Sequence, residues 1–477
     1  MPNEFQTGVP TNRSKSVGWR SLAFDPADPK AALAELPQST AVFALYGADS
    51  RAEPYIGRTP NLRSRLERLL QPSAKHPRRL HLAGLVRRIE WQLTGSEFES
   101  LLAQFSLLEE IFGAKALERM HLRSPAFVRF LGSNPYPRVT VTHRPSLREA
   151  DWAYGPFPSR AAAERFSEEA LKLFLLRRCT FELAPEPSYP GCVYSEMKMC
   201  LAPCFKGCTD ERYAEESVAV ERFLATRGES RLVTLRTERD QASASLSFES
   251  AAALHSQVQR VEAVRALAAE LVRPLSRLRA VILQASANPD EVAVFFFEGG
   301  RLRGPAALST LGMRIQNEQS GSTSLFAQPL AIEAIPEEQG TGNREQGSEK
   351  QRTEEQGVGS REQGASEQGS EGAEKQETGN KEQGSDQTPV APKIARGVLE
   401  SRLEAALAAL SAPSTAPSAT IRQAHLALLK RWYYRPEARR VGEIFFPDAD
   451  DHWPIKAILR GVGRVAAERL KPSVSAS

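Results

Sequence analysis

The chain has 477 residues, of which 41% are hydrophobic and 25% are charged, and its formal net charge is only +4. This length allows two or three domains with cores of their own. The sequence has no apolar run of about 18 residues, as a membrane-spanning helix would need, and its first residues lack the apolar core of a signal peptide, so a cytoplasmic protein is expected.

The pattern of elements predicts an α/β (α+β) multidomain protein. Residues 1–34 are expected to be a disordered lead-in, followed by a small α/β domain over 35–144. In this domain AVFALYG and PYIG are typical of short strands, and NLRSRLERLL has the leucine spacing of an amphipathic helix. Ser96 and Glu99, three positions apart, have the spacing of a capping box at the start of a second helix.

The first of these helices belongs to a strongly basic stretch. From Arg58 to Arg88 there are nine Lys or Arg residues and one acid, Glu67. Such a local excess of positive charge attracts a polyanion such as DNA, although a solvated basic face remains the alternative. The candidate DNA-binding residues are Arg58, Arg63, Arg65, Arg68, Lys75, Arg78 and Arg79.

All five cysteines lie in a predicted cysteine-rich domain over 145–209, at positions Cys179, Cys192, Cys200, Cys204 and Cys208. In a reducing compartment, such clustering favours metal or iron–sulfur ligation over disulfides. The spacing lacks the two close pairs of a standard zinc finger, and four thiolates satisfy either zinc or an iron–sulfur cluster. Free thiols in a small core, or thiols that sense redox state, are the alternatives.

The remaining segments differ sharply in composition. Residues 210–275 have the pattern of a helical hairpin, and residues 276–333 contain a strand pair around a Gly-Gly turn. In residues 334–392 the tripeptide EQG recurs and large apolar residues are nearly absent, which predicts a disordered linker. Residues 393–477 are expected to form a C-terminal helical or mixed domain.

Four stretches in order resemble the amino-terminal half of the UvrC subunit of the bacterial excinuclease. They are LPQSTAVFALYG with PYIGRTPNLRSRL, YGPFPSRAAAERFSEEALKLFLLRRC, GCVYSEMKMCLAPC, and RDQASASLSFESAAALHSQVQRVEAV. The resemblance covers about residues 36–310. It implies a GIY-YIG nuclease domain, a cysteine run that holds an iron–sulfur cluster in some members, and a UVR motif that binds the UvrB helicase. The family's carboxy-terminal RNase H-like nuclease and helix-hairpin-helix pair have no recognised counterpart in this sequence.

The resemblance implies metal ligation by Cys179, Cys192, Cys200 and Cys204, with Cys208 as a spare. It also implies partner binding where two short helices meet, at Leu246, Phe248, Ala252 and Leu254. Intramolecular packing of that hairpin is the alternative.

The nuclease site implied by the resemblance is incomplete. Tyr55 and Arg65 match the family's second Tyr and its helix Arg, and Arg58 replaces a Lys. The family's first Tyr is Phe43 here, and its metal-binding Glu is Gln104. A neutral amide is a poor ligand for Mg²⁺, which prefers anionic oxygen, and no other acid lies three or four positions from Gln104.

These residues predict a nucleotide excision repair protein that binds DNA and a UvrB-type partner, with incision weak or lost. The alternative is an active endonuclease with Mg²⁺ or Mn²⁺ at this site, reached through a slip in the motif matching or through Glu99 as an unusual ligand.

Overall fold

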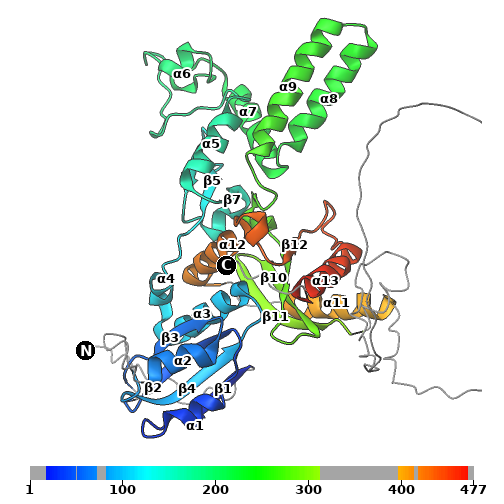
Figure 1. Cartoon of the computed structure of the whole chain (residues 1–477). Coiled ribbons are helices and arrows are strands. Elements are labelled where there is room, and N and C mark those ends of the chain that lie inside the picture. The colour runs from blue at the N-terminus through cyan, green and yellow to red at the C-terminus, as the bar shows by residue number, and fades with distance from the viewer. Residues whose placement is uncertain (1–17, 50, 72–81, 312–395, 413–416, 471–477) are drawn as a thin grey trace, which may run out of the picture. The chain divides into compact units, whose positions relative to one another are not determined.

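A computed structural model describes residues 18–49, 51–71, 82–311, 396–412 and 417–470 (Figure 1). In these ranges helices combine with three four-stranded sheets, and every strand pair is antiparallel. The chain is therefore an α/β multidomain protein, as predicted. None of the helices in these ranges is long and apolar enough to cross a membrane.

The first sheet has the strand order β1-β4-β2-β3 and carries Phe43, Tyr55 and Arg58, three residues of the expected nuclease motif. Its strands are β1 (Trp19–Ala23), β2 (Ala41–Gly47), β3 (Tyr55–Thr59) and β4 (Val86–Leu93). Its helices are α1 (Pro29–Ala34), α2 (Leu62–Leu70) and α3 (Glu97–Phe112). Alternate residues of β2 point to opposite faces of the sheet, so that Phe43 and Leu45 pack with α2 while Val42 and Ala44 pack with α3.

The second sheet has the order β6-β5-β7-β8. Its strands are β5 (Ala126–Phe130), β6 (Val139–Thr142), β7 (Ala153–Phe157) and β8 (Arg273–Pro274). The nearby short elements are η1 (Gly113–Lys115), α4 (Ala116–Arg119), η2 (Leu147–Trp152), α6 (Val193–Glu196), η3 (Pro203–Phe205) and η4 (Leu275–Arg277). The longer helix α5 (Arg160–Leu171) contributes Phe166 and Ala170 to the core beside this sheet.

Three further helices follow the cysteine region: α7 (Asp210–Ala225), α8 (Glu229–Ala244) and α9 (Phe248–Ala266). The predicted hairpin corresponds to α8 and α9, and α7 is an additional helix. Gly228, with φ of +84°, occupies the left-handed region between α7 and α8, where glycine is favoured.

The third sheet has the order β11-β10-β9-β12 and unites segments that are far apart in the sequence. Its strands are β9 (Ala280–Ala285), β10 (Glu291–Glu298), β11 (Arg301–Ser309) and β12 (Glu443–Phe445), and its neighbours are α11 (Arg396–Ser411), α12 (Ala419–Tyr433), η5 (Glu437–Arg439) and α13 (Ile455–Leu470). Val294 and Phe296 pack with α11 and α13, whereas Phe295 and Phe297 pack with α12. Burial on both faces explains the uninterrupted apolar run of β10.

Three boundaries differ from those expected from the sequence. Within 1–34, residues 19–23 form β1, paired with β4, and residues 29–34 form α1, so the described part of the lead-in is ordered. The expected boundary at 144 divides the second sheet, because β5 and β6 precede it and β7 follows it. The segments 276–333 and 393–477 contribute strands to one sheet, because β12 pairs with β9. Short, half-buried strands such as β1 and β12 have weak local patterns and are stabilised by distant pairing.

Candidate functional site

Phe43, which stands where the family has its first Tyr, is buried in an apolar contact. Phe43 is 0% exposed and lies opposite Gly57 in the pair β2–β3. A Cβ atom on Gly57 would lie 2.7 Å from the Phe43 Cζ atom, so a larger residue at 57 would displace the ring. Glycine in the second motif is therefore explained by the packing of this aromatic side chain.

Tyr55 and Arg65 are brought together beside Phe43. The Arg65 Nη2 group donates to the Tyr55 hydroxyl at 3.3 Å, and the Tyr55 and Phe43 ring centroids lie 6.2 Å apart. Arg65 lies in α2, whose start is capped by the Asn61 side chain, which accepts from the Ser64 N–H at 3.0 Å. The tyrosine and arginine of the expected nuclease motif thus keep a mutual contact.

Arg58, the second cation of the expected motif, lies on the opposite face of the edge strand β3. It is paired across the sheet with Val42, which packs toward α3, and its Nη1 group lies 3.3 Å from Glu97 Oε1. Tyr55 packs with the α2 side. Arg58 and the Tyr55–Arg65 pair therefore lie on opposite faces of the edge strand β3.

The carboxylates nearby have other partners. Glu99 is 6% exposed, and its Oε2 atom accepts from the Gly95 N–H at 2.7 Å, while its own N–H donates to Ser96 Oγ at 3.1 Å. Ser96 thus caps α3 as expected, but the reciprocal bond of a capping box, from the Ser96 N–H to the Glu99 side chain, is replaced by the one from Gly95. Burial raises the pKa of Glu99 to about 6. Gln104 is half-buried on the same helix. Within the described residues, no carboxylate pairs with the Tyr55 hydroxyl or the Arg65 guanidinium.

Glu97, the first residue of α3, is held by a distant arginine. Arg435 donates from Nη1 to Oε2 and from Nη2 to Oε1 of Glu97, both at 2.8 Å. Arg431 lies 4.0 Å from the same carboxylate. The hydrogen bond from Arg435 is the largest of the effects that lower the pKa of Glu97. Three arginines thus surround one acid, which leaves local positive charge beside β3.

Sequence reasoning missed Arg431 and Arg435. They lie more than 300 positions from Glu97, and no local pattern connects them to it. They reach α3 because α12 and α3 share a core, in which the Phe98 ring lies 5.5 Å from Trp432 and 5.2 Å from Phe295.

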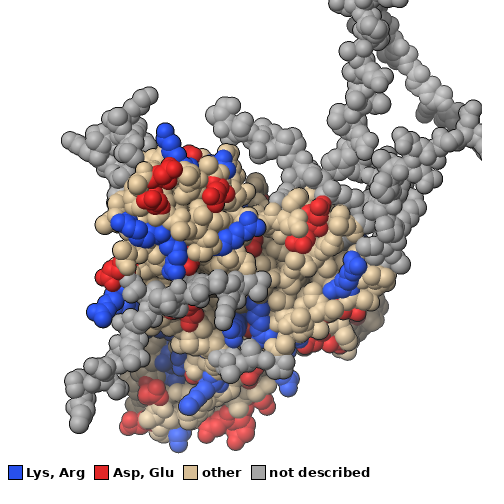
Figure 2. All heavy atoms as spheres, turned by 90° about the horizontal axis from the view of Figure 1, so that it is seen from below, with Lys and Arg blue, Asp and Glu red and all other residues tan. Residues whose placement is uncertain are grey.

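The other predicted DNA-binding residues differ in their surroundings. Arg63 donates to the Leu36 and Ala34 carbonyls at 2.7 and 2.8 Å, and Arg68 donates to the Ser64 carbonyl at 3.1 Å. Arg63 therefore stabilises the end of α1 as well as offering charge. Three of the predicted residues lie outside the described residues: Lys75, Arg78 and Arg79. On the face shown in Figure 2, Lys and Arg side chains are interspersed with Asp and Glu.

Four of the five cysteines line one small cavity, and these are the four that the resemblance selects: Cys179, Cys192, Cys200 and Cys204. Cys208 does not line it. Among the described residues, no three thiol sulfurs lie within 4.8 Å of one another. Tetrahedral zinc, with Zn–S bonds of about 2.3 Å, holds its sulfurs roughly 3.8 Å apart. The described thiol sulfurs are therefore not set at the spacing that a bound tetrahedral zinc would impose on three of them.

Two N–H groups point at these sulfurs. Arg177 Nη1 lies 3.5 Å from Cys179 Sγ, and the Ala202 N–H donates to Cys200 Sγ at 3.3 Å. Arg177 is 1% exposed and also donates to the Tyr136 carbonyl at 2.9 Å. Hydrogen bonds of this kind stabilise thiolate ligands, so the donor set fits a metal or iron–sulfur centre. Sequence reasoning did not identify Arg177.

The predicted partner-binding residues lie at and near the tip of the α8–α9 hairpin. Leu246 and Phe248 are 72% and 67% exposed, and Ala252 is also exposed. Leu254, six residues after Phe248 in α9, is half-buried against the neighbouring hydrophobic core. Intramolecular packing therefore accounts for Leu254 but not for Leu246 or Phe248.

The comparisons with known proteins point to one family. The family model described as the UvrC/Cho excinuclease middle domain matches residues 127–223. This segment of the chain is therefore similar to the UvrC middle domain. It runs from β5 to α7 and contains all five cysteines.

Curated relatives extend the likeness to half of the UvrC-like chain. It is 30% identical over 238 residues to the UvrABC system protein C of Alcanivorax borkumensis, 29% over 241 residues to that of Pseudomonas protegens, and 26% over 239 residues to that of Aliivibrio fischeri. Each match covers 50% of this chain and 39% of the relative. No solved structure matches the chain.

Proposed function

We propose that this UvrC-like chain is a nucleotide excision repair protein that binds DNA and a UvrB-type partner, and that its GIY-YIG-like site cuts weakly or not at all. The observation that carries this proposal is the Tyr55–Arg65 pair, which keeps its 3.3 Å contact while no described carboxylate pairs with either group.

The loss of cutting follows from the chemistry of phosphodiester hydrolysis. A divalent metal must polarise the phosphate and stabilise the leaving oxygen, and Mg²⁺ or Mn²⁺ needs anionic oxygen ligands to bind there. Gln104 supplies a neutral amide at the family's ligand position, and Glu99 is committed to the Gly95 N–H. Phe43 also lacks the hydroxyl that would help to activate water or order the substrate.

DNA binding is supported by the cations that remain beside β3. Arg58 is exposed and Arg65 is half-buried, and the two flank the edge strand; Arg431 and Arg435 add two charges next to the single acid Glu97. A guanidinium keeps free N–H groups after one ion pair because it has five donors. Phosphate oxygens are therefore the ligands that this surface suits.

Partner binding is supported by the hairpin tip. Leu246 and Phe248 expose large apolar surfaces on a loop and helix start, where isolated solvent exposure has no structural benefit. A helix pair of a UvrB-type protein that covers these side chains would remove them from water.

The cysteine centre has a structural role in this proposal. Cys179, Cys192, Cys200 and Cys204 would hold an iron–sulfur cluster, with zinc as the alternative, and a bound centre would link the segments that carry them. Its ligands lie within the region that the middle-domain family model matches.

Two binding measurements test the proposal. Fluorescence anisotropy with a lesion-bearing duplex should show binding that weakens with salt, and Arg58→Ala with Arg65→Ala should lower the slope of log affinity against log salt by about 0.9 per lost phosphate contact. Arg160→Ala, at an exposed arginine paired with Glu164 in α5, is the matched control. Unchanged affinity and slope in the double variant would show that this surface does not bind the DNA.

Pull-down of the UvrB-type partner tests the hairpin. Phe248→Asp should abolish binding, whereas Val233→Asp should not, because Val233 is 55% exposed on α8 away from the tip. Equal capture by the wild type and Phe248→Asp would reject docking at the tip.

A further inference from the structure

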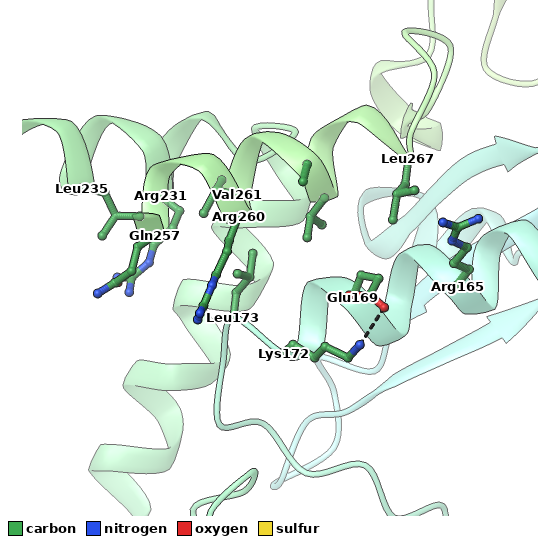
Figure 3. Close-up of a pocket in the computed structure, with 12 residues that line it drawn as sticks. Arg165, Glu169, Lys172, Leu173, Arg231, Leu235, Gln257, Arg260, Val261 and Leu267 are labelled. Carbon is green, nitrogen blue, oxygen red and sulfur yellow. Dashed lines mark hydrogen bonds and ion pairs between the residues drawn. The ribbon is translucent and has the colours of Figure 1, made fainter. Parts of the chain in front are cut away.

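A basic groove lies between the end of α5 and the base of the α8–α9 hairpin, away from the hairpin tip (Figure 3). Its volume is about 610 Å³, which is within the range of specific ligand pockets. Side chains of α5 form one wall, and side chains of α8 and α9 form the other.

The floor of the groove is aliphatic. Leu235, Val261 and Val264 belong to the buried core, and Leu173 and Leu267 are half-buried against it. Leucine and valine side chains favour apolar side chains of a partner over water. Among the described residues that line the groove none is aromatic, so they offer nothing on which a nucleic acid base could stack.

The rim carries an unbalanced positive charge. Four cations, Arg165, Lys172, Arg231 and Arg260, face one acid, Glu169, which gives a net charge of +3. Lys172 is paired with Glu169 at 2.7 Å. Within the described residues, the three arginines have no carboxylate partner.

Elsewhere in the α8–α9 hairpin, the arginines do have carboxylate partners. Arg236, Arg239 and Arg265 lie 2.8, 2.7 and 3.1 Å from carboxylates of Glu262, Asp240 and Glu229. The hairpin therefore pairs its arginines elsewhere and leaves those at the groove available.

We propose that this groove is a docking site for an acidic amphipathic helix of a protein partner. Apolar residues at every third or fourth position of such a helix would contact the aliphatic floor. Glu or Asp residues on its flanks would pair with Arg165, Arg231 and Arg260 through charge-assisted hydrogen bonds.

The groove is separate from the hairpin tip. Phe248 begins α9 and Leu267 follows its last residue, and a helix of 19 residues spans about 28 Å. Loss of binding at one surface can therefore be measured independently of the other, and the groove does not depend on the proposed partner of the tip.

The test uses the full chain and a fluorescent synthetic helical peptide with Leu at helical spacing and Glu between, compared with a peptide in which Lys replaces Glu. The wild type should bind the Glu peptide more tightly. Arg231→Glu with Arg260→Glu should weaken binding by about tenfold or more, because two attractive contacts become repulsive. Arg239→Glu, the same change on α8 outside the groove, should leave the affinity unchanged.

Two further variants separate docking from misfolding. Arg231→Gln with Arg260→Gln should weaken binding less than the Glu pair, with an unchanged unfolding midpoint. Leu173→Asp should weaken binding because it places a charge in the aliphatic floor of the groove. Equal binding of the two peptides, or an equal effect of Arg239→Glu, would overturn the proposal. Binding of a duplex oligonucleotide but not the Glu peptide, lost in the same arginine variants, would assign the groove to nucleic acid and also overturn it.

Discussion

The ion pair between Glu97 and Arg435 should couple the start of α3 energetically to the segment that directly follows α12. Its two hydrogen bonds are both 2.8 Å long, and the side chains are 39% and 29% exposed. Hydrogen bonds to charged groups contribute roughly 1.5–3 kcal/mol when buried, whereas exposed ion pairs contribute about 0.2–1 kcal/mol. Solvent screening at this exposure places the expected coupling free energy at about 1 kcal/mol.

The coupling can be measured with a double-mutant cycle of Glu97→Gln and Arg435→Met. Urea unfolding followed by tryptophan fluorescence reports on this core because Trp432 is buried in it. At pH 7 the two single changes should be non-additive by about 1 kcal/mol.

The same cycle has a predicted pH dependence. The pKa of Glu97 is lowered in the folded chain from its ordinary value of 4.5, chiefly by the hydrogen bond from Arg435. The stabilisation is therefore fully present above the unfolded value and is lost as pH falls through the lower folded value. Coupling below about 0.3 kcal/mol at pH 7, or equal coupling in strongly acidic solution, would refute this reasoning.

Three other outcomes follow from the packing and the sites. Phe98→Ala should cost about 3–5 kcal/mol of unfolding free energy, because Phe98 is 3% exposed between Phe295 and Trp432; Phe248→Ala at the exposed tip should change it by less than about 0.5 kcal/mol. Cys204→Ser should lower the bound iron or zinc and any visible absorption of anaerobically purified protein, whereas Cys208→Ser should not, and wild-type protein with neither metal near stoichiometry would disprove the centre. Arg177→Met should shift that absorption or its reduction potential, since it removes a hydrogen bond to Cys179; an unchanged spectrum and potential would limit Arg177 to a packing role.

Local patterns predicted the elements whose signals lie within a few residues. The capping residue Ser96 starts α3. The Gly-Gly turn at 299–300 joins β10 and β11, where both glycines have positive φ. The four cysteines that line one cavity are those that the family resemblance selects, and their ligation of a centre stays a prediction.

The features of the fold and the site that the sequence did not predict depend on contacts between distant segments. Glu443–Phe445 is too short to be recognised as a strand until it pairs with β9, more than 150 residues earlier. Arg435 can be recognised as the partner of Glu97 only because α12 packs on α3 in the structure. The boundary near residue 144 was misplaced because a sheet can continue across a loop, and a loop signal alone does not show which strands will pair.

The central claim is that the site binds DNA without cutting it, and incision of a lesion-bearing duplex with UvrA, a UvrB-type partner and Mg²⁺ tests it most directly. The unmodified chain should bind without nicking, Phe43→Tyr with Gln104→Glu should restore some metal-dependent nicking, and Arg65→Ala added to that pair should abolish it. Robust Mg²⁺- or Mn²⁺-dependent incision by the unmodified chain, lost on Tyr55→Phe, would contradict the account and establish an active endonuclease.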